Sequence, residues 1–199
     1  TSGEESIEKM VGQKDVERGV IVHRLDKDTS GVCILAKTQS AYESLKKQFA
    51  DHTIIKKYIT AVYGKTPRGG EIITYIVRDP KRKQAMKAAV YPTGLERGSL
   101  RSATTRYRKI KDVCIGKDAL SVLEVSIETG RTHQIRVHMQ SIGHPVLGDA
   151  MYFSKSSRNL STRLCVQRQL LHSYEITFEH PITLKSITIT APIPNDLDS

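Results

Sequence analysis

Most of the regular structure predicted from this sequence is β-strand, and the few helical stretches do not alternate with the strands. Runs of β-branched and aromatic residues indicate strands at residues 19–23, 32–36, 54–63, 71–78, 102–111, 119–128, 175–178 and 186–190. Apolar residues at helical spacing predict helices at residues 40–51 and 132–142. Because no regular βαβ repeat is present, we expect an α+β fold, with a mixed, mainly antiparallel β-sheet flanked by a few helices and loops.

Size and composition restrict the class of protein. The chain has 199 residues and three cysteines, Cys33, Cys114 and Cys165, without a CxxC pair. This argues against a disulfide framework and a thiolate zinc site, and favours a reducing compartment. No apolar run approaches the roughly 20 residues of a membrane-spanning helix, and the N-terminus lacks the apolar centre of a signal peptide. We expect a polar lead-in at residues 1–18, one domain at 19–199, and a cytoplasmic location, or an organelle in a eukaryote.

Positive charge is concentrated in one segment. The net charge of the chain is +10, and residues 78–111 alone hold eleven basic and two acidic side chains. Such a block, which we expect on a loop, is typical of a surface that contacts a polyanion such as a nucleic acid. A solvated, charged hairpin would give the same pattern, so the charge predicts where a phosphate backbone could lie and not what chemistry occurs.

The densest polar cluster is residues 23–31, which lie between two apolar runs. A calcium-binding loop starting at Asp26 would need a bidentate Glu where this chain has Lys37, so that interpretation fails. One remaining interpretation is an aspartyl phosphotransferase that uses Asp26 and Asp28 with magnesium. Another is a single nucleophilic or basic Asp26 beside Arg24 at the edge of an RNA groove. A polar β-turn without any chemistry is the third.

A second polar cluster, residues 129–138, supplies cations. His133 and Arg136 are three residues apart and are expected on one helix face. An arginine that emerged near Asp26 would pair bidentately with it. No carboxylate or thiolate accompanies the histidines in this cluster, and the spacing of His133 and His138 does not bring both rings to one face, so we expect no metal site.

The order of these motifs resembles that of the RluA-type pseudouridine synthases, a family of RNA uridine isomerases. Residues 23–31 resemble the aspartate motif of the family, and residues 56–64 resemble its strand with a tyrosine. Its third motif is matched by residues 130–138 and 143–149, and its C-terminal segment by residues 169–172, 178–181 and 191–194. One departure is the Lys-Pro pair that the family usually has upstream of the aspartate, because residues 1–22 contain no proline.

The resemblance implies a role for several residues. Three residues would be catalytic: Asp26 as the catalytic aspartate, Tyr58, which would stack on the flipped uracil and assist proton removal, and Arg136, which would pair with Asp26. Arg24 would enter the space left by the flipped base, and Ile135 would line the pocket. The remaining residues expected to bind RNA come from both motifs and from the basic block: His23, Thr29, Ser30, Gly31, Arg131, His133, Gln134, Lys81, Arg82 and Lys83.

The resemblance also implies the reaction and its partner, the conversion of uridine to pseudouridine in a structured RNA. Ribosomal RNA is the first candidate substrate and transfer RNA the second. The alternative is a catalytically inactive relative that only binds RNA. Because the isomerisation is redox-neutral and uses no phosphoryl donor, we expect it to need no cofactor and no metal. We also expect a monomer without a membrane partner.

Overall fold

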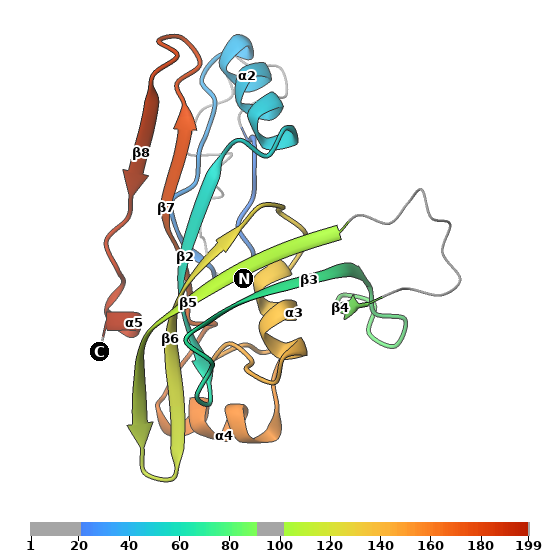
Figure 1. The fold of residues 1–199 in the computed structure, drawn as a ribbon, viewed down its shortest axis with the longest axis vertical. Helices are drawn as coiled ribbons and strands as arrows, with labels where there is room; N and C mark the ends of the chain where they lie inside the picture. The colour runs from blue at the N-terminus through green and yellow to red at the C-terminus, as the bar shows by residue number, and fades with distance from the viewer. Residues whose placement is uncertain (1–20, 91–101, 199) are drawn as a thin grey trace, which may run out of the picture.

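The structure is a computed structural model that describes residues 21–90 and 102–198. Within these residues eight strands form one sheet in the order β1-β7-β2-β6-β5-β3-β4, and β8 pairs with β7 (Figure 1). The strands are β1 (Ser30–Gly31), β2 (Ile55–Tyr63), β3 (Gly69–Arg78), β4 (Met86–Ala89), β5 (Ser102–Ile115), β6 (Asp118–Ile127), β7 (Leu171–Glu179) and β8 (Ser186–Thr190). Only the β1–β7 pairing is parallel among these strands, which confirms the predicted mixed, mainly antiparallel sheet.

Two of the helices match the prediction. They are α2 (Gln39–Ala50) and α3 (Gln134–Ser141). The side chain of Thr38 caps α2 by accepting from the N–H of Ala41, a common start for a helix. Helix α3 begins two residues later than predicted, because His133 has a left-handed backbone with φ of 57°. His133 and Arg136 therefore do not share a helix face.

The chain around the aspartate motif does not form the predicted strands. The strand at residues 32–36 is wrong, and of residues 19–23 only 21–23 are described, in which Ile21 makes an isolated bridge to Leu35. Burial here comes from packing rather than from pairing, since Ile34 and Ala36 lie in a cluster with Leu45 of α2. The apolar runs therefore mark core positions and not a ladder of hydrogen bonds.

Four short elements have no counterpart in the prediction: β1, β4, α4 (Lys155–Arg163) and α5 (Asn195–Asp198). Helix α4 has no stripe of apolar residues that would predict it, because its sequence is polar apart from Leu160. It is fixed instead by a capping box between Ser154 and Ser157 and by the complete burial of Leu160. Capping boxes satisfy otherwise unpaired N–H groups at a helix start.

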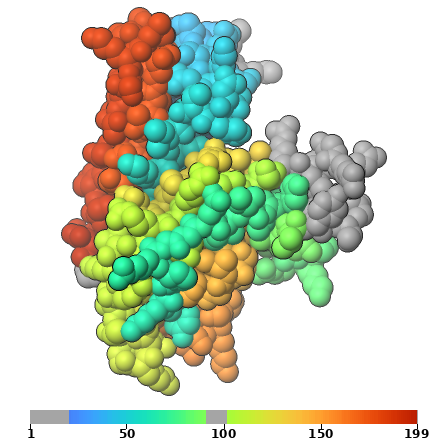
Figure 2. Space-filling view, in the orientation of Figure 1, coloured from blue at the N-terminus to red at the C-terminus, as the bar shows by residue number. Residues whose placement is uncertain are grey.

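The central strands β2 and β6 are buried on both faces of the sheet. Tyr58 and Val62 of β2 pack toward α3 in one apolar cluster. Ile59 and Ala61 point the other way into a second cluster, with Leu160 of α4. Beyond them, the β7–β8 hairpin lies beside α2 at one end of the molecule (Figure 2), where Gln48 exchanges two hydrogen bonds with the main chain of Glu179.

The described residues of the basic block from 78 to 111 lie only partly on a loop. They span the end of β3, the turn that joins β3 to β4, strand β4 and the first part of β5, while residues 91–101 lie outside the described residues. Three cations of β5 have acidic partners: Arg106 pairs with Glu71 and Glu128, Arg108 with Glu124, and Lys109 with Asp112. The charge of these three residues is therefore neutralised by neighbouring carboxylates.

The predicted boundary at residue 18 also lies outside the described residues. None of the helices in the described part of the chain is long and apolar enough to cross a membrane.

Candidate active site

Asp26 lies on the wall of a cavity between the loop before β1, strand β2 and the start of α3. Its side chain is 20% exposed. Eight residues that the sequence analysis selects line this cavity together: Arg24, Asp26, Thr29, Tyr58, Arg131, His133, Gln134 and Ile135. Segments from three distant parts of the sequence thus meet at one carboxylate.

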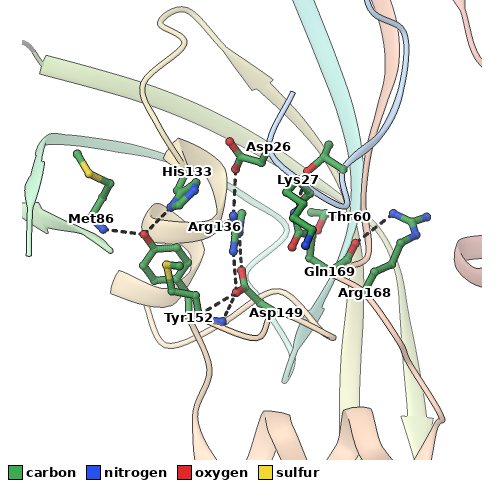
Figure 3. A network of polar contacts seen from close by, with 12 residues as sticks. Asp26, Lys27, Thr60, Met86, His133, Arg136, Asp149, Tyr152, Arg168 and Gln169 are labelled. Atoms are coloured by element: carbon green, nitrogen blue, oxygen red, sulfur yellow. Dashed lines mark hydrogen bonds and ion pairs between the residues drawn. The ribbon is translucent and has the colours of Figure 1, made fainter. Parts of the chain in front are cut away.

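Arg136 forms an ion pair with Asp26. Its Nη1 donates to Oδ2 of Asp26 at 3.2 Å (Figure 3), so the ion pair that the resemblance implies is present. The other side of the guanidinium faces Asp149, to which Nε and Nη2 donate at 2.7 and 3.0 Å. Burial alone would lower the pKa of Arg136, but the hydrogen bonds and negative charges of Asp149 and Asp26 raise it instead. The arginine therefore stays a cation between two carboxylates.

Tyr152 connects this ion pair to neighbouring elements. Its ring lies 5.1 Å from the guanidinium carbon of Arg136, a distance typical of a cation–π contact. The hydroxyl accepts from the N–H of Met86 in β4 at 2.7 Å and lies 2.8 Å from Nδ1 of His133 (Figure 3). Burial lowers the pKa of His133, so its Nδ1 is suited to accept the proton of the tyrosine hydroxyl.

The loop that carries Asp26 is tied to the segment before β7. Gln169 donates from Nε2 to the carbonyl oxygen of Lys27 at 2.7 Å and to the hydroxyl of Thr29 at 3.0 Å (Figure 3). Arg168 donates to the carbonyl oxygen of Asp28 at 3.1 Å. The two residues hold the main chain on both sides of the turn, so the carboxylate projects from a backbone that is fixed by hydrogen bonds.

Strand β1 joins the same loop to β7, with which it pairs in parallel. The hydroxyl of Ser30 is 2.8 Å from Nδ1 of His172. Gly31 has φ of +116°, and a Cβ at this position would lie 2.1 Å from the carbonyl oxygen of Ser173. Only glycine fits such a contact without a shift of the backbone. Ser30 and Gly31 thus hold the loop in place and are not on the wall of the cavity at Asp26.

Tyr58 lies beside Asp26 and is 8% exposed. Burial raises the pKa of its hydroxyl to about 12, and the negative charge of Asp26 contributes in the same direction. The phenol is therefore protonated at neutral pH. A ring at this place can support a planar ligand, and its hydroxyl can donate a hydrogen bond.

His23 and Gln134 make internal contacts. Nε2 of His23 accepts from the N–H of Ile34 at 2.8 Å, and its ring stacks on Phe49 at 4.8 Å between centroids. Burial, followed by the charge of Lys56, lowers the pKa of His23 to about 4, so the ring is neutral. Gln134 donates to the carbonyl oxygen of Thr104 and to the hydroxyl of Thr105, and its carbonyl accepts from Thr129. The polar atoms of both residues are thus used within the protein, although Gln134 also lines the cavity at Asp26.

The basic residues Lys81, Arg82 and Lys83 lie in the turn between β3 and β4 and do not line the cavity at Asp26. Arg82 pairs with Asp79 and donates to the carbonyl oxygen of Met151. The lysines are exposed. The two lysines therefore lie away from the cavity at Asp26, whereas Arg82 reaches the ring of Tyr152, with 5.9 Å between the guanidinium carbon and the ring centre.

The sequence analysis gives no role to Asp149, Tyr152, Arg168 or Gln169. The sequence does contain an indication of Asp149. A buried helix that carries Arg136 needs an acidic partner. Asp149 directly precedes residues 150–174, which have four basic and no acidic side chains. Tyr152, Arg168 and Gln169 act through contacts between distant segments, and no spacing in the sequence indicates these. Within residues 21–90 and 102–198, no group of three or more His, Cys, Asp or Glu side chains is arranged to hold a metal ion.

Comparison with known proteins gives consistent results. The family model described as RNA pseudouridylate synthase matches residues 3–141. The ribosomal large subunit pseudouridine synthase D of Zymomonas mobilis is 42% identical over 191 residues, which are 95% of this chain and 57% of that protein. That of Nitrosomonas europaea is 38% identical over 92% of this chain and 50% of its own length. The chain thus spans about half the length of the curated relatives it matches.

Two solved human structures have the same fold. RNA Pseudouridylate Synthase Domain Containing 1 superposes with a TM-score of 0.74 at 26% identity, over 87% of this chain and 69% of that chain. RNA Pseudouridylate Synthase Domain Containing 4 superposes with a TM-score of 0.70 at 21% identity, over 90% and 73%, and it shows the likeness of fold alone.

Proposed function

Because this chain belongs to the RNA pseudouridylate synthase family, we propose that it isomerises uridine to pseudouridine in RNA, with Asp26 as the catalytic residue. The curated relatives named above carry ribosomal large subunit in their names, which supports ribosomal RNA as the first candidate substrate. Transfer RNA is the second. The observation that carries the proposal is a partly exposed carboxylate that is held by a buried arginine on the wall of a cavity.

The reaction exchanges one bond to the ribose for another. The N1–C1′ bond of uridine breaks, the uracil rotates, and C5 bonds to C1′. C5 then loses its proton and N1 gains one, so the product is an isomer of the substrate. Asp26 would either attack the nucleoside as a nucleophile or remove a proton from it, and both roles require a carboxylate close to the sugar. The two hydrogen bonds that Arg136 donates to Asp149 leave its Nη1 for Asp26 and so direct the Asp26 carboxylate.

A uridine within a structured RNA must leave its stack to reach Asp26, which costs a few kcal/mol. Tyr58 is placed to support the extruded base, since an aromatic face contributes roughly 1–3 kcal/mol to binding of a base. Arg24 is exposed on the same cavity wall, and its planar guanidinium can stack between bases and contact phosphate. Tyr58 would thus support the base outside the stack, and Arg24 would fill the space that the base leaves.

The direct test is Asp26→Asn, measured by release of tritium from RNA that contains uridine labelled at C5. We expect turnover to be abolished while the fold is kept. The matched control is Asp28→Asn, two residues away in the same turn, because asparagine tolerates the left-handed backbone that Asp28 adopts with φ of 67°. The control should retain turnover. Full release by the Asp26 variant would show that the reaction does not use this carboxylate.

Two other interpretations predict different outcomes of the same assay. An inactive RNA-binding relative would bind RNA and release no tritium with either the unmodified chain or the variants. A magnesium-dependent aspartyl phosphotransferase would lose its activity in EDTA, whereas we expect tritium release to survive there. Ribosomal RNA and transfer RNA offered separately would identify the substrate.

A further inference from the structure

A second cavity adjoins the one that contains Asp26. It has a volume of about 380 Å³, compared with about 90 Å³ for the cavity at Asp26. The two share part of their walls, namely Arg24, Tyr58, Ile127, Gly130 and Arg131. The second cavity extends from this shared wall toward the C-terminal end of α2, where Phe49 and His52 line it. A nucleotide bound at Asp26 would therefore have its neighbour in the chain close to this cavity.

Lys56 lines the second cavity from the start of β2, and only 6% of its surface is exposed. Its ammonium group lies 5.7 Å from the ring centre of Phe49. Among the described residues, no carboxylate and no hydrogen-bond acceptor contacts this nitrogen. Burial disfavours the charged form of the side chain and lowers the pKa of Lys56. A largely buried cation that has only an aromatic ring beside it and that lines a cavity indicates that a ligand supplies an anionic partner.

The chemistry of the wall identifies the class of ligand. Arg24 and Arg131 line the same cavity as Lys56, and none of the lining side chains in the described part of the chain is acidic. A wall with three cationic and no acidic side chains favours an anion. His23 also faces this space, but its ring is neutral and its Nε2 accepts from the N–H of Ile34, so the positive charge on this part of the wall is that of Lys56.

We propose that this cavity is an anion subsite in which Lys56 binds a backbone phosphate of the RNA next to the target uridine. The inference rests on the proposed function for its ligand, because an RNA strand that places a base at Asp26 brings a phosphodiester to the shared wall. The subsite fixes the position of the strand, whereas Asp26 performs the chemistry. It is separate from the basic turn between β3 and β4, which does not line either cavity.

The neighbouring residue provides a matched control. Lys57 precedes the same tyrosine on the same strand, but alternation along a strand directs it to the opposite face. There its ammonium pairs with Glu175 at 2.7 Å, and its side chain is 36% exposed. Lys56→Met and Lys57→Met therefore remove the same charge from adjacent positions of the 199-residue chain. Lys56→Arg keeps the charge at the first position.

The experiment measures binding of a labelled RNA stem-loop with a uridine in its loop, over a series of KCl concentrations. Each phosphate contact contributes roughly 0.7–0.9 to the slope of log affinity against log salt. Lys56→Met should lower the slope by this amount and weaken binding about tenfold. Lys57→Met should leave both unchanged, and Lys56→Arg should restore most of the slope. The melting temperature should be kept or raised in Lys56→Met, because a buried charge is replaced by an apolar chain, so loss of fold would not explain weaker binding.

Inorganic phosphate distinguishes a small-anion site from an RNA subsite. Thermal unfolding in potassium phosphate is compared with that in KCl of the same ionic strength. If phosphate stabilises the unmodified chain but not Lys56→Met, while the RNA slopes are equal, the cavity binds free phosphate and the RNA subsite is overturned. Equal RNA slopes without a phosphate effect overturn the proposal entirely.

Tritium release is measured in parallel and reports on the proposed function alone. A chain that shows the Lys56 effect on binding but releases no tritium would retain the subsite and lose the proposed activity. A chain that releases tritium with equal slopes for Lys56→Met and Lys57→Met would retain the activity and lose the subsite.

Discussion

Arg136 and Asp149 form a buried ion pair with two contact points, from Nε and Nη2 of the arginine to the two carboxylate oxygens at 2.7 and 3.0 Å. The aspartate side chain is fully buried and the arginine side chain is 7% exposed. Asp149 also accepts from the N–H groups of Met151 and Tyr152. The orientation of the guanidinium is thus set on the side away from the cavity, and its remaining nitrogen is directed at Asp26.

We expect Asp149→Ala to destabilise the fold by about 3–5 kcal/mol, because it leaves a buried arginine without its main partner. Urea unfolding measures this. Asp196→Ala is the control, since Asp196 pairs with Arg168 at two points of 2.8 Å but its side chain is 44% exposed. An exposed pair contributes about 1 kcal/mol or less. Equal losses in the two variants would contradict the role of burial.

The second prediction concerns Gly31 in the loop that carries Asp26. We expect Gly31→Ala to destabilise the fold and to abolish most turnover, because its Cβ would overlap the main chain of Ser173 and displace the loop that carries Asp26. Gly116→Ala is the control. Gly116 also has a positive φ, of 62°, but nothing lies within 4 Å of the added Cβ. The control should therefore lose only the roughly 1–2 kcal/mol of a left-handed alanine, measured by urea unfolding, and keep its tritium release.

The sequence predicts the strands of this fold well where side chains alternate between two buried faces. Strands β2 and β6 are found within one residue of their predicted bounds, because each contributes to the apolar clusters on both sides of the sheet. The strand predicted at 32–36 is wrong because Ile34 and Ala36 are buried by packing against α2 and not by pairing in the sheet. Burial of this kind gives the same run of apolar residues as a strand.

The candidate site is predictable to the extent that local motifs define it. Asp26 and Arg136 come from two such motifs, and the structure joins them at 3.2 Å. Asp149 is 13 residues from its partner Arg136, and the need of a buried arginine for an acidic partner points to it. Gln169, in contrast, completes the site through a contact of long range in the sequence, to the carbonyl of Lys27. Positioning of this kind depends on which segments the fold makes neighbours, and a single sequence does not contain that information.

Two buried histidines predict a loss of stability in acid. Burial lowers the pKa of both His23 and His138 to about 4 in the folded protein, and the charge of Lys56 adds to the effect at His23. The unfolded chain takes up these protons near pH 6.5. Between the two pKa values the unfolded chain therefore binds more protons than the folded protein, and the free energy of unfolding falls as the pH drops from 6.5 toward 4.

Urea unfolding at pH 7 and pH 5 measures this difference, which should be roughly 1–2 kcal/mol for each histidine. His133 and His172 have pKa values lowered by burial and add to it in the same direction. His23→Gln can still accept from the N–H of Ile34 but does not titrate, so its stability should depend less on pH. A variant with the full pH dependence of the unmodified chain would show that His23 is not held neutral by the fold.

The cations of the basic block fall into two groups. Lys81, Lys83 and Lys87 are exposed around the turn between β3 and β4 and form no ion pair with the described residues. Three cations of β5, in contrast, are paired with acidic side chains of β3, β5 and β6 and with Glu128 directly after β6; these cations are Arg106, Arg108 and Lys109. The lysines around the turn are therefore the ones available to a phosphate backbone.

This difference supplies the last prediction. Changing the three lysines to glutamine should weaken RNA binding and lower the logarithmic salt slope by about 0.7–0.9 for each phosphate that the turn no longer binds. Changing Arg106, Arg108 and Lys109 to glutamine removes the same net charge, but these cations already have carboxylate partners, so the slope should change much less. Titration of a labelled RNA over a series of KCl concentrations measures both slopes. Equal slopes for the two triple variants would mean that net charge alone, and not binding at the turn, governs how this surface attracts RNA.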